Sequence, residues 1–362
     1  MKEIGQARVI DVFHRRAESV RQVHAATTKK VWLGINQLGE REECMQFRHG
    51  RLLNTAAIAM IVWMTGNAAF AQSKTQNLPA TFTMKVECNK KGSINAALAM
   101  LSKTGMTRGV TITVTGTCHE DVLVQGFDRL TLITTTGATI DDPSGATLPT
   151  VNIVDSQSVT VQGFTINGGE EGVICGGVSV SVCYLTGNTI QSSTFSGVFV
   201  SAASSAVLNG NVVQNNLGRG MTVNVNSSAN STDDTFQGNT GGGIAANQGY
   251  FIAGTSTIQN NGGIGVFATD HAAIRLVTSA VSGNGAAGVS VQGGSEAEFD
   301  ETNVTGNGGN GVVIRDLSFA KFSTSNVTGN LGGTDVNCKP QFPATRGALT
   351  DIGGGTTNCV EP

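Results

Sequence analysis

The sequence predicts an all-β fold, a right-handed parallel β-helix solenoid of three parallel sheets with a short N-terminal capping helix. Three observations predict it: a glycine marker that returns about every 23 residues, an asparagine marker with the same step, and apolar residues that alternate within each repeat. Gly accounts for 48 of the 362 residues, while charged residues make up only 14%. Such a composition suits many short strands joined by tight turns.

The glycine marker begins six successive coils. The first begins at Gly197 with GVFV and the last at Gly311 with GVVI, in steps of 23, 23, 22, 23 and 23 residues. The asparagine marker keeps the same step at Asn216, Asn239, Asn261, Asn284, Asn307 and Asn330. Self-similarity at a fixed period indicates a solenoid whose coils bury their faces against their neighbours. We expect the asparagines to stack coil on coil, with each amide bonding the next.

Apolar residues recur at fixed offsets from each leading glycine. Offsets 1 and 3 carry Val198 and Val200 in one coil, and offsets 9 and 11 carry Ala297 and Phe299 in another. Offset 16 carries Val213, Phe236, Val281, Val304 and Val327. A spacing of two within a group is the alternation of a strand that buries one face. Each coil therefore predicts three short strands, and the stacked coils predict three parallel sheets around one core.

The segment before the regular coils predicts a cap. Residues 93–105 read SINAALAMLSKTG, with Ser93 as a plausible N-cap and Gly105 after the last turn. One face carries the apolar residues Ile94, Ala97, Leu98 and Leu101. A short amphipathic helix here would cover the open end of the solenoid, as an exposed sheet edge requires. The resulting boundaries are an N-terminal segment with capping helix at 72–105, a β-helix at 106–337 and a C-terminal cap or tail at 338–362.

A short apolar run precedes these domains. Residues 56–64 follow several basic residues, and Ala69-Phe70-Ala71 supplies small residues where a signal peptidase requires them. The pattern predicts a signal peptide at 45–71, cleaved after Ala71, and a secreted or periplasmic protein. A membrane anchor would need ~20 apolar residues, so we expect no stable anchor. Residues 1–44 would then be an upstream extension from a start codon chosen too early.

Cleavage would change the charge and the cysteine count. Residues 1–71 hold 10 of the 23 basic and 6 of the 26 acidic residues, which leaves 13 and 20 and a net charge of −7. An acidic surface argues against a nucleic-acid partner. Six cysteines would remain, and an even count in an exported chain suggests disulfides. Proximity favours Cys88–Cys118, Cys175–Cys183 and Cys338–Cys359, while no CxxC motif or Cys/His cluster supports the alternative of a metal site.

Several segments resemble the pectin-lyase-like superfamily of parallel β-helix proteins. They are the helix SINAALAMLSK, the segment GVTITVTGTCHEDVLV and the coils after Gly197, and together they span nearly all of 85–335. The superfamily includes pectate lyases, polygalacturonases, uronan epimerases and phage tailspikes. The resemblance therefore implies the fold and a polysaccharide or cell-surface glycan as partner, and it leaves the activity open.

One polar strip in the last coils would suit an enzyme. Lyases and epimerases of the superfamily need a base, a charge neutraliser and often Ca²⁺. Asp270 and His271 lie in the segment TDH, and Arg315 lies two coils later, so we expect His271 or Arg315 as base and Arg275 as neutraliser. TDH resembles part of the Asp-Pro-His-Asp motif of alginate epimerases, without its Pro and second Asp. A polar turn is the plainer interpretation, since the motifs of pectate lyases and polygalacturonases are absent.

Acidic residues give a candidate metal site. Glu296, Glu298 and Asp300 alternate with inward-facing residues, so they share the outer face of one strand and would suit Ca²⁺, the one cofactor that the sequence suggests. The competing interpretation is a charge ladder, because Arg275, Glu298 and Lys321 occupy the same offset in successive coils. A further pair, Asp233 and Asp234, we expect in a solvated turn.

Aromatic residues are scarce in the part expected to remain after cleavage. Both tryptophans fall within 1–71, and the tyrosines that remain are Tyr184 and Tyr250, with Phe199 and Phe267 facing outward. Sugar clefts often use exposed aromatic faces as platforms. The sequence therefore favours an exported, non-catalytic glycan- or partner-binding surface module. The alternative is a polysaccharide lyase or epimerase that acts on uronate-containing polymers.

Overall fold

The computed structural model describes residues 82–177, 179–338 and 352–359. These residues form a solenoid of three parallel sheets with one α-helix, which confirms the fold class that the repeat predicts. The expected extension at 1–44 and signal peptide at 45–71 lie outside the described residues. In the described part of the chain, no helix has the length and apolar character needed to cross a membrane.

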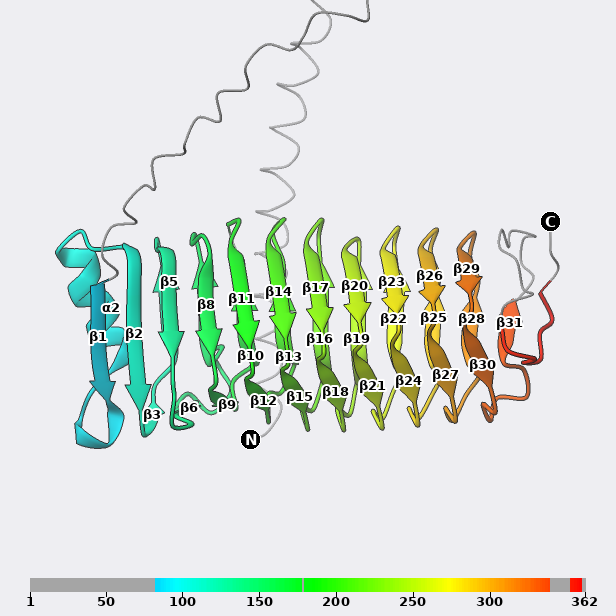
Figure 1. Ribbon diagram of the computed structural model, residues 1–362, viewed down its shortest axis with the longest axis horizontal. Helices are drawn as coiled ribbons and strands as arrows, with labels where there is room; N and C mark the ends of the chain where they lie inside the picture. Colours follow the sequence, from blue (N-terminus) through cyan, green and yellow to red (C-terminus); the bar gives the residue numbers. More distant parts are fainter. Residues whose placement is uncertain (1–81, 178, 339–351, 360–362) are drawn as a thin grey trace, which may run out of the picture. The chain divides into compact units, whose positions relative to one another are not determined.

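Sheet A has eleven strands, which stand side by side in Figure 1. Each pairs in parallel with the strand one coil away, as β23 does with β26. The strands are β1 (Phe82–Glu87), β2 (Arg108–Thr115), β5 (Asp128–Ile133), β8 (Val159–Gln162), β11 (Val182–Thr186), β14 (Ser205–Asn209), β17 (Ser228–Thr232), β20 (Tyr250–Gly254), β23 (Ala273–Val277), β26 (Glu296–Asp300) and β29 (Phe319–Ser323).

Sheets B and C have ten strands each. Sheet B consists of β3 (Thr117–His119), β6 (Thr139–Asp141), β9 (Thr165–Asn167), β12 (Thr189–Gln191), β15 (Val212–Gln214), β18 (Thr235–Gln237), β21 (Thr257–Gln259), β24 (Ala280–Ser282), β27 (Asn303–Thr305) and β30 (Asn326–Thr328). Sheet C consists of β4 (Val122–Gln125), β7 (Val151–Val154), β10 (Glu171–Cys175), β13 (Ser196–Val200), β16 (Arg219–Asn224), β19 (Gly242–Asn247), β22 (Val266–Thr269), β25 (Val289–Val291), β28 (Val312–Ile314) and β31 (Val336–Cys338). The chain visits the sheets in the order C, A, B within each regular coil.

The N-terminal end of the solenoid is closed by α2 (Ile94–Lys103), which lies beside β1 in Figure 1. As the sequence predicts, Ser93 is the N-cap, and its hydroxyl accepts from the Ala96 N–H at 3.1 Å. The Glu120 carboxylate accepts from the Ile94 and Asn95 N–H groups at 2.6 and 3.1 Å, where the helix dipole favours a negative charge. The predicted apolar face is buried. A 3₁₀ turn, η1 (Cys88–Lys90), joins β1 to this region.

The core follows the offsets read from the sequence. Val198, Val200, Ala206, Leu208 and Val213 are buried, so one coil contributes five side chains at offsets 1, 3, 9, 11 and 16. Phe299 and Phe322 occupy the same offset in neighbouring coils, and their rings stack at 4.7 Å between centroids. Burial at about 25 cal/mol per Å² of apolar surface makes this continuous column the main source of stability.

Asparagines form the predicted ladder in the turn between sheets B and C. Each Nδ2 donates to the Oδ1 of the next coil at 2.8–3.0 Å, from Asn216 as far as Asn330, and Asn330 donates to Asp335. A second, shorter ladder lies between sheets A and B, where Asn188 donates to Asn211 and Asn211 to Asp234. The expectation of a solvated turn is therefore wrong for Asp234, which is only 1% exposed because it completes this ladder.

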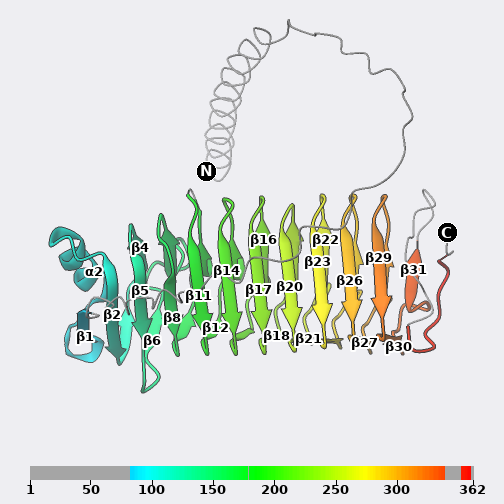
Figure 2. The same ribbon diagram turned by 45° about the horizontal axis from the view of Figure 1, so that its top comes forward.

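The C-terminal end is closed by a short segment after β31, at the β30 and β31 end of Figure 2. Ile352 is buried, and its carbonyl accepts from the Val327 N–H at 3.1 Å. The three predicted disulfides are present: Cys88–Cys118, Cys175–Cys183 and Cys338–Cys359. The first and last tie down the two ends of the solenoid.

Candidate functional site

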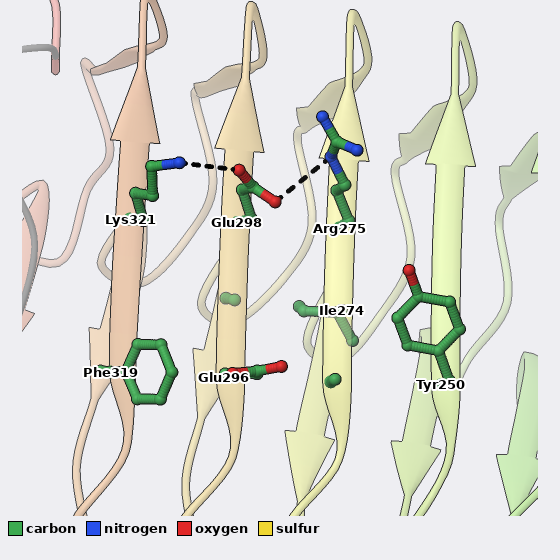
Figure 3. Close-up of a pocket in the computed structure, with 9 residues that line it drawn as sticks. Tyr250, Ile274, Arg275, Glu296, Glu298, Phe319 and Lys321 are labelled. Atoms are coloured by element: carbon green, nitrogen blue, oxygen red, sulfur yellow. Dashed lines mark hydrogen bonds and ion pairs between the residues drawn. The ribbon is translucent and has the colours of Figure 1, made fainter. Parts of the chain in front are cut away.

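A groove of about 250 Å³ lies on the outer face of sheet A, across strands β20, β23, β26 and β29 (Figure 3). Its lining consists of Tyr250, Ala273, Ile274, Arg275, Glu296, Ala297, Glu298, Phe319 and Lys321. Because these strands pair in register, the side chains that face outward form rows that cross the strands. Two such rows make up the groove.

The first row gives the groove its shape. Tyr250, Ala273, Glu296 and Phe319 are register partners on the four strands. Tyr250 is 46% exposed and Phe319 is 38% exposed, and three strand spacings place them roughly 14 Å apart. Ala273 has the smallest side chain of the row, so a hollow remains between the Tyr250 ring and the Glu296 side chain (Figure 3). The groove therefore has an aromatic ring at each end and a carboxylate in the middle.

The second row is the charge ladder expected from the offsets. Lys321 Nζ donates to Glu298 Oε1 at 3.0 Å, and Arg275 Nε lies 3.3 Å from Glu298 Oε2 (Figure 3). The Arg275 guanidinium also lies 3.5 Å from Asp300. The Arg275 Nε contact is a charge contact, because it lacks the geometry of a hydrogen bond. Exposed pairs of this kind are worth about 0–1 kcal/mol each, so the row contributes little to stability.

The structure does not gather the predicted catalytic residues into one constellation. Asp270 and His271 form the turn between β22 and β23, and both have positive φ, at 55° and 66°. In the described part of the chain, the His271 imidazole has no hydrogen-bond or ion-pair partner. Arg315 follows β28, and its Nε donates to Gln292 Oε1 at 2.6 Å. Arg275 belongs to the groove instead, so the base and the neutraliser proposed from sequence lie in different surroundings.

The predicted metal ligands are also separated. Glu298 is held by Arg275 and Lys321, and Asp300 lies against Arg275, so cations already neutralise both carboxylates. Glu296 lies in the other row. Among the described residues, the three acids do not bring their oxygens within 4.8 Å of one another. A Ca²⁺ ion would have to displace both basic side chains before it could bind here.

Two features of the surface were missed from the sequence. Phe319 was not singled out, yet it forms one end of the groove. The signal was present, because strand alternation around offsets 9 and 11 places offset 8 on the outer face. The offsets do not pair Tyr250 with Phe319. Because the step from Gly243 to Gly265 has 22 residues, Tyr250 has offset 7 in its coil while Phe319 has offset 8 in its own.

A further missed feature lies on sheet C. Glu171, Ser196 and Arg219 are register partners, and Glu171 is only 9% exposed. Burial and the nearby Glu170 charge raise the pKa of Glu171 to about 7. The Arg219 guanidinium lies 5.9 Å from the centre of the Phe267 ring, a cation–π contact, and no acidic side chain of the described residues pairs with it. This carboxyl group can gain or lose a proton near neutral pH.

Comparison with known proteins identifies the family. Residues 102–254 and 247–342 match the family model described as the right handed beta helix region. The chain belongs to this family. None of the curated proteins compared matches this β-helix chain in sequence.

Solved structures share the same architecture. The A-module of the Azotobacter vinelandii mannuronan C-5 epimerase AlgE4 is 13% identical, with 74% of this β-helix chain and 93% of that chain covered and a TM-score of 0.54. The A-module of AlgE6 from the same organism is 14% identical, with 70% and 79% covered and a TM-score of 0.54. The enzymatically active domain of the bacteriophage CBA120 tailspike protein 2 is 10% identical, with 70% and 46% covered and a TM-score of 0.52. At these identities the likeness shows the fold alone.

Proposed function

We propose that this β-helix protein binds a polysaccharide without catalysing a reaction on it, and that the groove on sheet A holds a segment of that polysaccharide. The observation that supports this most directly is the pair of half-exposed rings, Tyr250 and Phe319, at the two ends of a groove lined with charged side chains. The similar structures named as mannuronan epimerase modules support a polysaccharide as the ligand class.

The chemistry of the groove suits sugar binding. Aromatic side chains offer an apolar face with a defined geometry, and a sugar ring has an apolar face of similar size. The charged row beside them offers cationic donors on Arg275 and Lys321 and acceptors on Glu298. Both rows cross the strands, so a polymer that follows them runs along the solenoid axis. A linear glycan can therefore contact both rings and the charged row at once.

The ion pairs support binding rather than catalysis. A charge neutraliser has to face the substrate carboxylate at short range. Arg275 instead shares its guanidinium between Glu298 and Asp300, and Lys321 also faces Glu298. The two positive and two negative side chains of the groove nearly cancel, which gives it no strong preference for an anionic polymer.

Substitution of the two rings tests the binding site. The purified protein is screened on a glycan array, and affinity for the best glycan is then measured by calorimetry. We expect Tyr250→Ala and Phe319→Ala each to weaken binding at least tenfold, because each removes one platform. Tyr184→Ala is the matched control, since Tyr184 lies on the outer face of β11, equally exposed at 38% but outside the groove. Unchanged affinity in both groove variants would contradict the assignment.

The enzymatic alternative rests on a different observation, the carboxyl group of Glu171. A pKa of about 7 suits a group that transfers protons at neutral pH. The protein is therefore incubated with a panel of uronans, with and without Ca²⁺, and unsaturated uronate and epimer ratios are followed. Turnover that disappears in His271→Ala, Arg315→Ala or Glu171→Gln would replace the binding proposal with a lyase or epimerase. Binding to the glycan array without turnover of any uronan would support the binding proposal.

A further inference from the structure

The outer face of sheet B is uncharged over eight successive strands, from β9 to β30. Each strand buries its middle residue and turns its first and third residues outward. The sixteen outward residues are Thr165, Asn167, Thr189, Gln191, Val212, Gln214, Thr235, Gln237, Thr257, Gln259, Ala280, Ser282, Asn303, Thr305, Asn326 and Thr328. None is charged and none is aromatic. The neighbouring sheet A, by contrast, carries the charge ladder on its outer face.

Amide side chains on this face are locked in place by one another. Gln259 donates to Gln237 at 3.1 Å, Gln237 to Gln214 at 3.0 Å, and Gln214 to Gln191 at 3.2 Å. The row continues through Asn167, whose Nδ2 donates to Asp141 at 2.7 Å. Glutamine loses much rotamer freedom when it is fixed, so an ordered and partly exposed row removes a cost that binding would otherwise carry.

The locked amides still have unused hydrogen-bonding capacity. An amide nitrogen has two N–H groups and its oxygen has two lone pairs, and the ladder uses one of each. Each of the Gln214 and Gln237 side chains therefore offers one further donor and one further acceptor. These groups repeat at the strand spacing of about 4.8 Å, and a parallel row that includes Thr189, Thr235 and Thr257 lies about 6.6 Å away along the strands.

The dimensions of the face favour an extended polymer over a folded protein as its occupant. Seven strand spacings give a length of roughly 34 Å, and three-residue strands give a width of roughly 10 Å. The resulting area of about 340 Å² is less than half of the ~800 Å² that each partner of a standard protein interface buries. A second copy of this chain or another globular partner would need more surface, whereas one extended polymer chain needs a strip of this shape.

The chemistry of the strip selects the class of polymer. A charged polymer would find no opposite charge among the sixteen side chains, and it would lose hydration on contact. A hydroxyl group both donates and accepts, so it complements an amide that has one free donor and one free acceptor. A neutral polysaccharide carries several hydroxyl groups on every residue. Each hydrogen bond adds little, but the amide ladder repeats the same groups over five strands, from Asn167 to Gln259, and adds the contributions along one polysaccharide chain.

We infer that the outer face of sheet B is a second binding surface, which takes an uncharged linear polysaccharide laid along the solenoid axis. It is independent of the groove on sheet A, because the two faces share no residue. The two surfaces together would let one molecule bridge two glycan chains.

Affinity gel electrophoresis tests this surface. The full protein is run through gels that contain hydroxyethylcellulose, galactomannan or dextran, with polygalacturonate as the charged arm. We expect at least one neutral polymer to retard the protein and the combined variant Gln214→Ala with Gln237→Ala to lose at least tenfold of that affinity. Gln162→Ala, at the end of β8 on sheet A, is the matched control and should keep it. Circular dichroism checks that each variant folds.

A second variant keeps the test decisive if the double variant does not fold. Thr235→Lys places one charge in the middle of the strip without touching the amide ladder, and it should also abolish retardation by the neutral polymer. Three results would overturn the inference. They are retardation of the protein by no neutral polymer, retardation of both strip variants as fully as the wild type, and strip variants that lose only their retardation by polygalacturonate. A dimer that dissociates on substitution would assign the face to a second copy instead. Tyr184→Ala, whose ring lies outside both surfaces, should leave this binding unchanged. The strip variants are also made in a Tyr250→Ala background, where they should again lose retardation, and this separates failure here from failure of the groove.

Discussion

The two buried amide ladders end in the same way but in opposite electrostatic surroundings. The long ladder passes its donated N–H groups from coil to coil as far as Asp335, and the short ladder does the same as far as Asp234. A carboxylate accepts hydrogen bonds and has none to donate when it is ionised. It can therefore end a row of amides without leaving a buried N–H group unpaired, which would cost about 1–3 kcal/mol.

The two carboxylates differ in what surrounds them. Burial raises the pKa of Asp335, but hydrogen bonds from the Thr356 and Asn330 N–H groups outweigh it, and the pKa is lowered overall. At Asp234, burial is the largest effect, and hydrogen bonds from Ser231 and Asn211 do not compensate for it, so the pKa is raised. The surroundings of Asp335 thus favour its charged form, and the surroundings of Asp234 favour its neutral form. The same structural role does not fix the same response to pH.

The largest expected effect comes from interrupting the long ladder in its middle. Asn261→Ala removes the acceptor for the Asn239 amide and the donors to Asn284 and to the Phe236 carbonyl. Several buried polar groups then lose their partners, and we expect a loss of about 3–5 kcal/mol in the free energy of unfolding. Urea unfolding followed by circular dichroism measures it. Gln259→Ala removes the last amide of the partly exposed row of sheet B in the same coil and should cost less than about 1 kcal/mol. Equal losses in the two variants would contradict the distinction.

The next effect is at the end of the long ladder. Asp335→Asn places an amide nitrogen among N–H donors, and we expect a loss of about 1–3 kcal/mol at neutral pH. Because the pKa of Asp335 is lowered on folding, its contribution is complete above the unfolded pKa and is lost as the pH falls through the folded value. The wild type should therefore lose more stability than the variant between neutral pH and about pH 3. Thermal melts over this range provide the measurement, and parallel curves would show that Asp335 is not the titrating group.

A smaller effect of opposite sign is expected at the end of the short ladder. The pKa of Asp234 is raised, so its contribution is complete below the unfolded pKa and is lost as the pH rises through the folded value. Asp234→Asn keeps an acceptor for Asn211 and cannot ionise. We expect the variant to exceed the wild type by about 1 kcal/mol at pH 8 and to lose this advantage near pH 4. A destabilised variant at pH 8 would mean that Asp234 needs its charge.

The smallest effect concerns the corner between sheets C and A, which lacks an amide ladder. Pairs of residues with positive φ make this turn, and Val225 is one of them at 48°, although branched side chains avoid that region. Its side chain is 46% exposed, so its replacement loses little packing. Val225→Asn should raise the free energy of unfolding by about 0.5–1 kcal/mol, because asparagine tolerates this conformation. Val207→Asn on β14, where the backbone is extended, is the control and should bring no gain.

Sequence predicted the repeated features well because each was observed several times. The buried alternation after Gly197, the Asn216 to Asn330 ladder and the pairing of Arg275 with Glu298 all follow from one register repeated through successive coils. Features that occur once were missed. β1 precedes the capping helix and has no repeat to mark it, and Asp234 replaces an asparagine of a ladder with only two others.

The surface was harder to predict than the core for a physical reason. Burial selects apolar side chains strongly, so Val198 or Phe299 reveals its position by its type. Outward positions accept many residue types, so neither Phe319 nor the row of glutamines stood out in composition. Both become visible only when register partners are known, since a platform or a hydrogen-bonded row depends on which strands lie side by side.

The long asparagine ladder also determines which insertions and deletions can change the length of the solenoid. Every amide between Asn239 and Asn307 has the same neighbours on both sides, so one whole coil is interchangeable with another. Deletion of one whole coil, which is 22 residues from Asn239 to Asn261 and 23 residues in the two coils that follow, would rejoin the rows in register. A deletion that is not a whole number of coils would misalign all three sheets. The two ends cannot be exchanged in this way, because each carries its own disulfide and its own cap. The number of central coils thus sets the length of the outer faces along the solenoid axis.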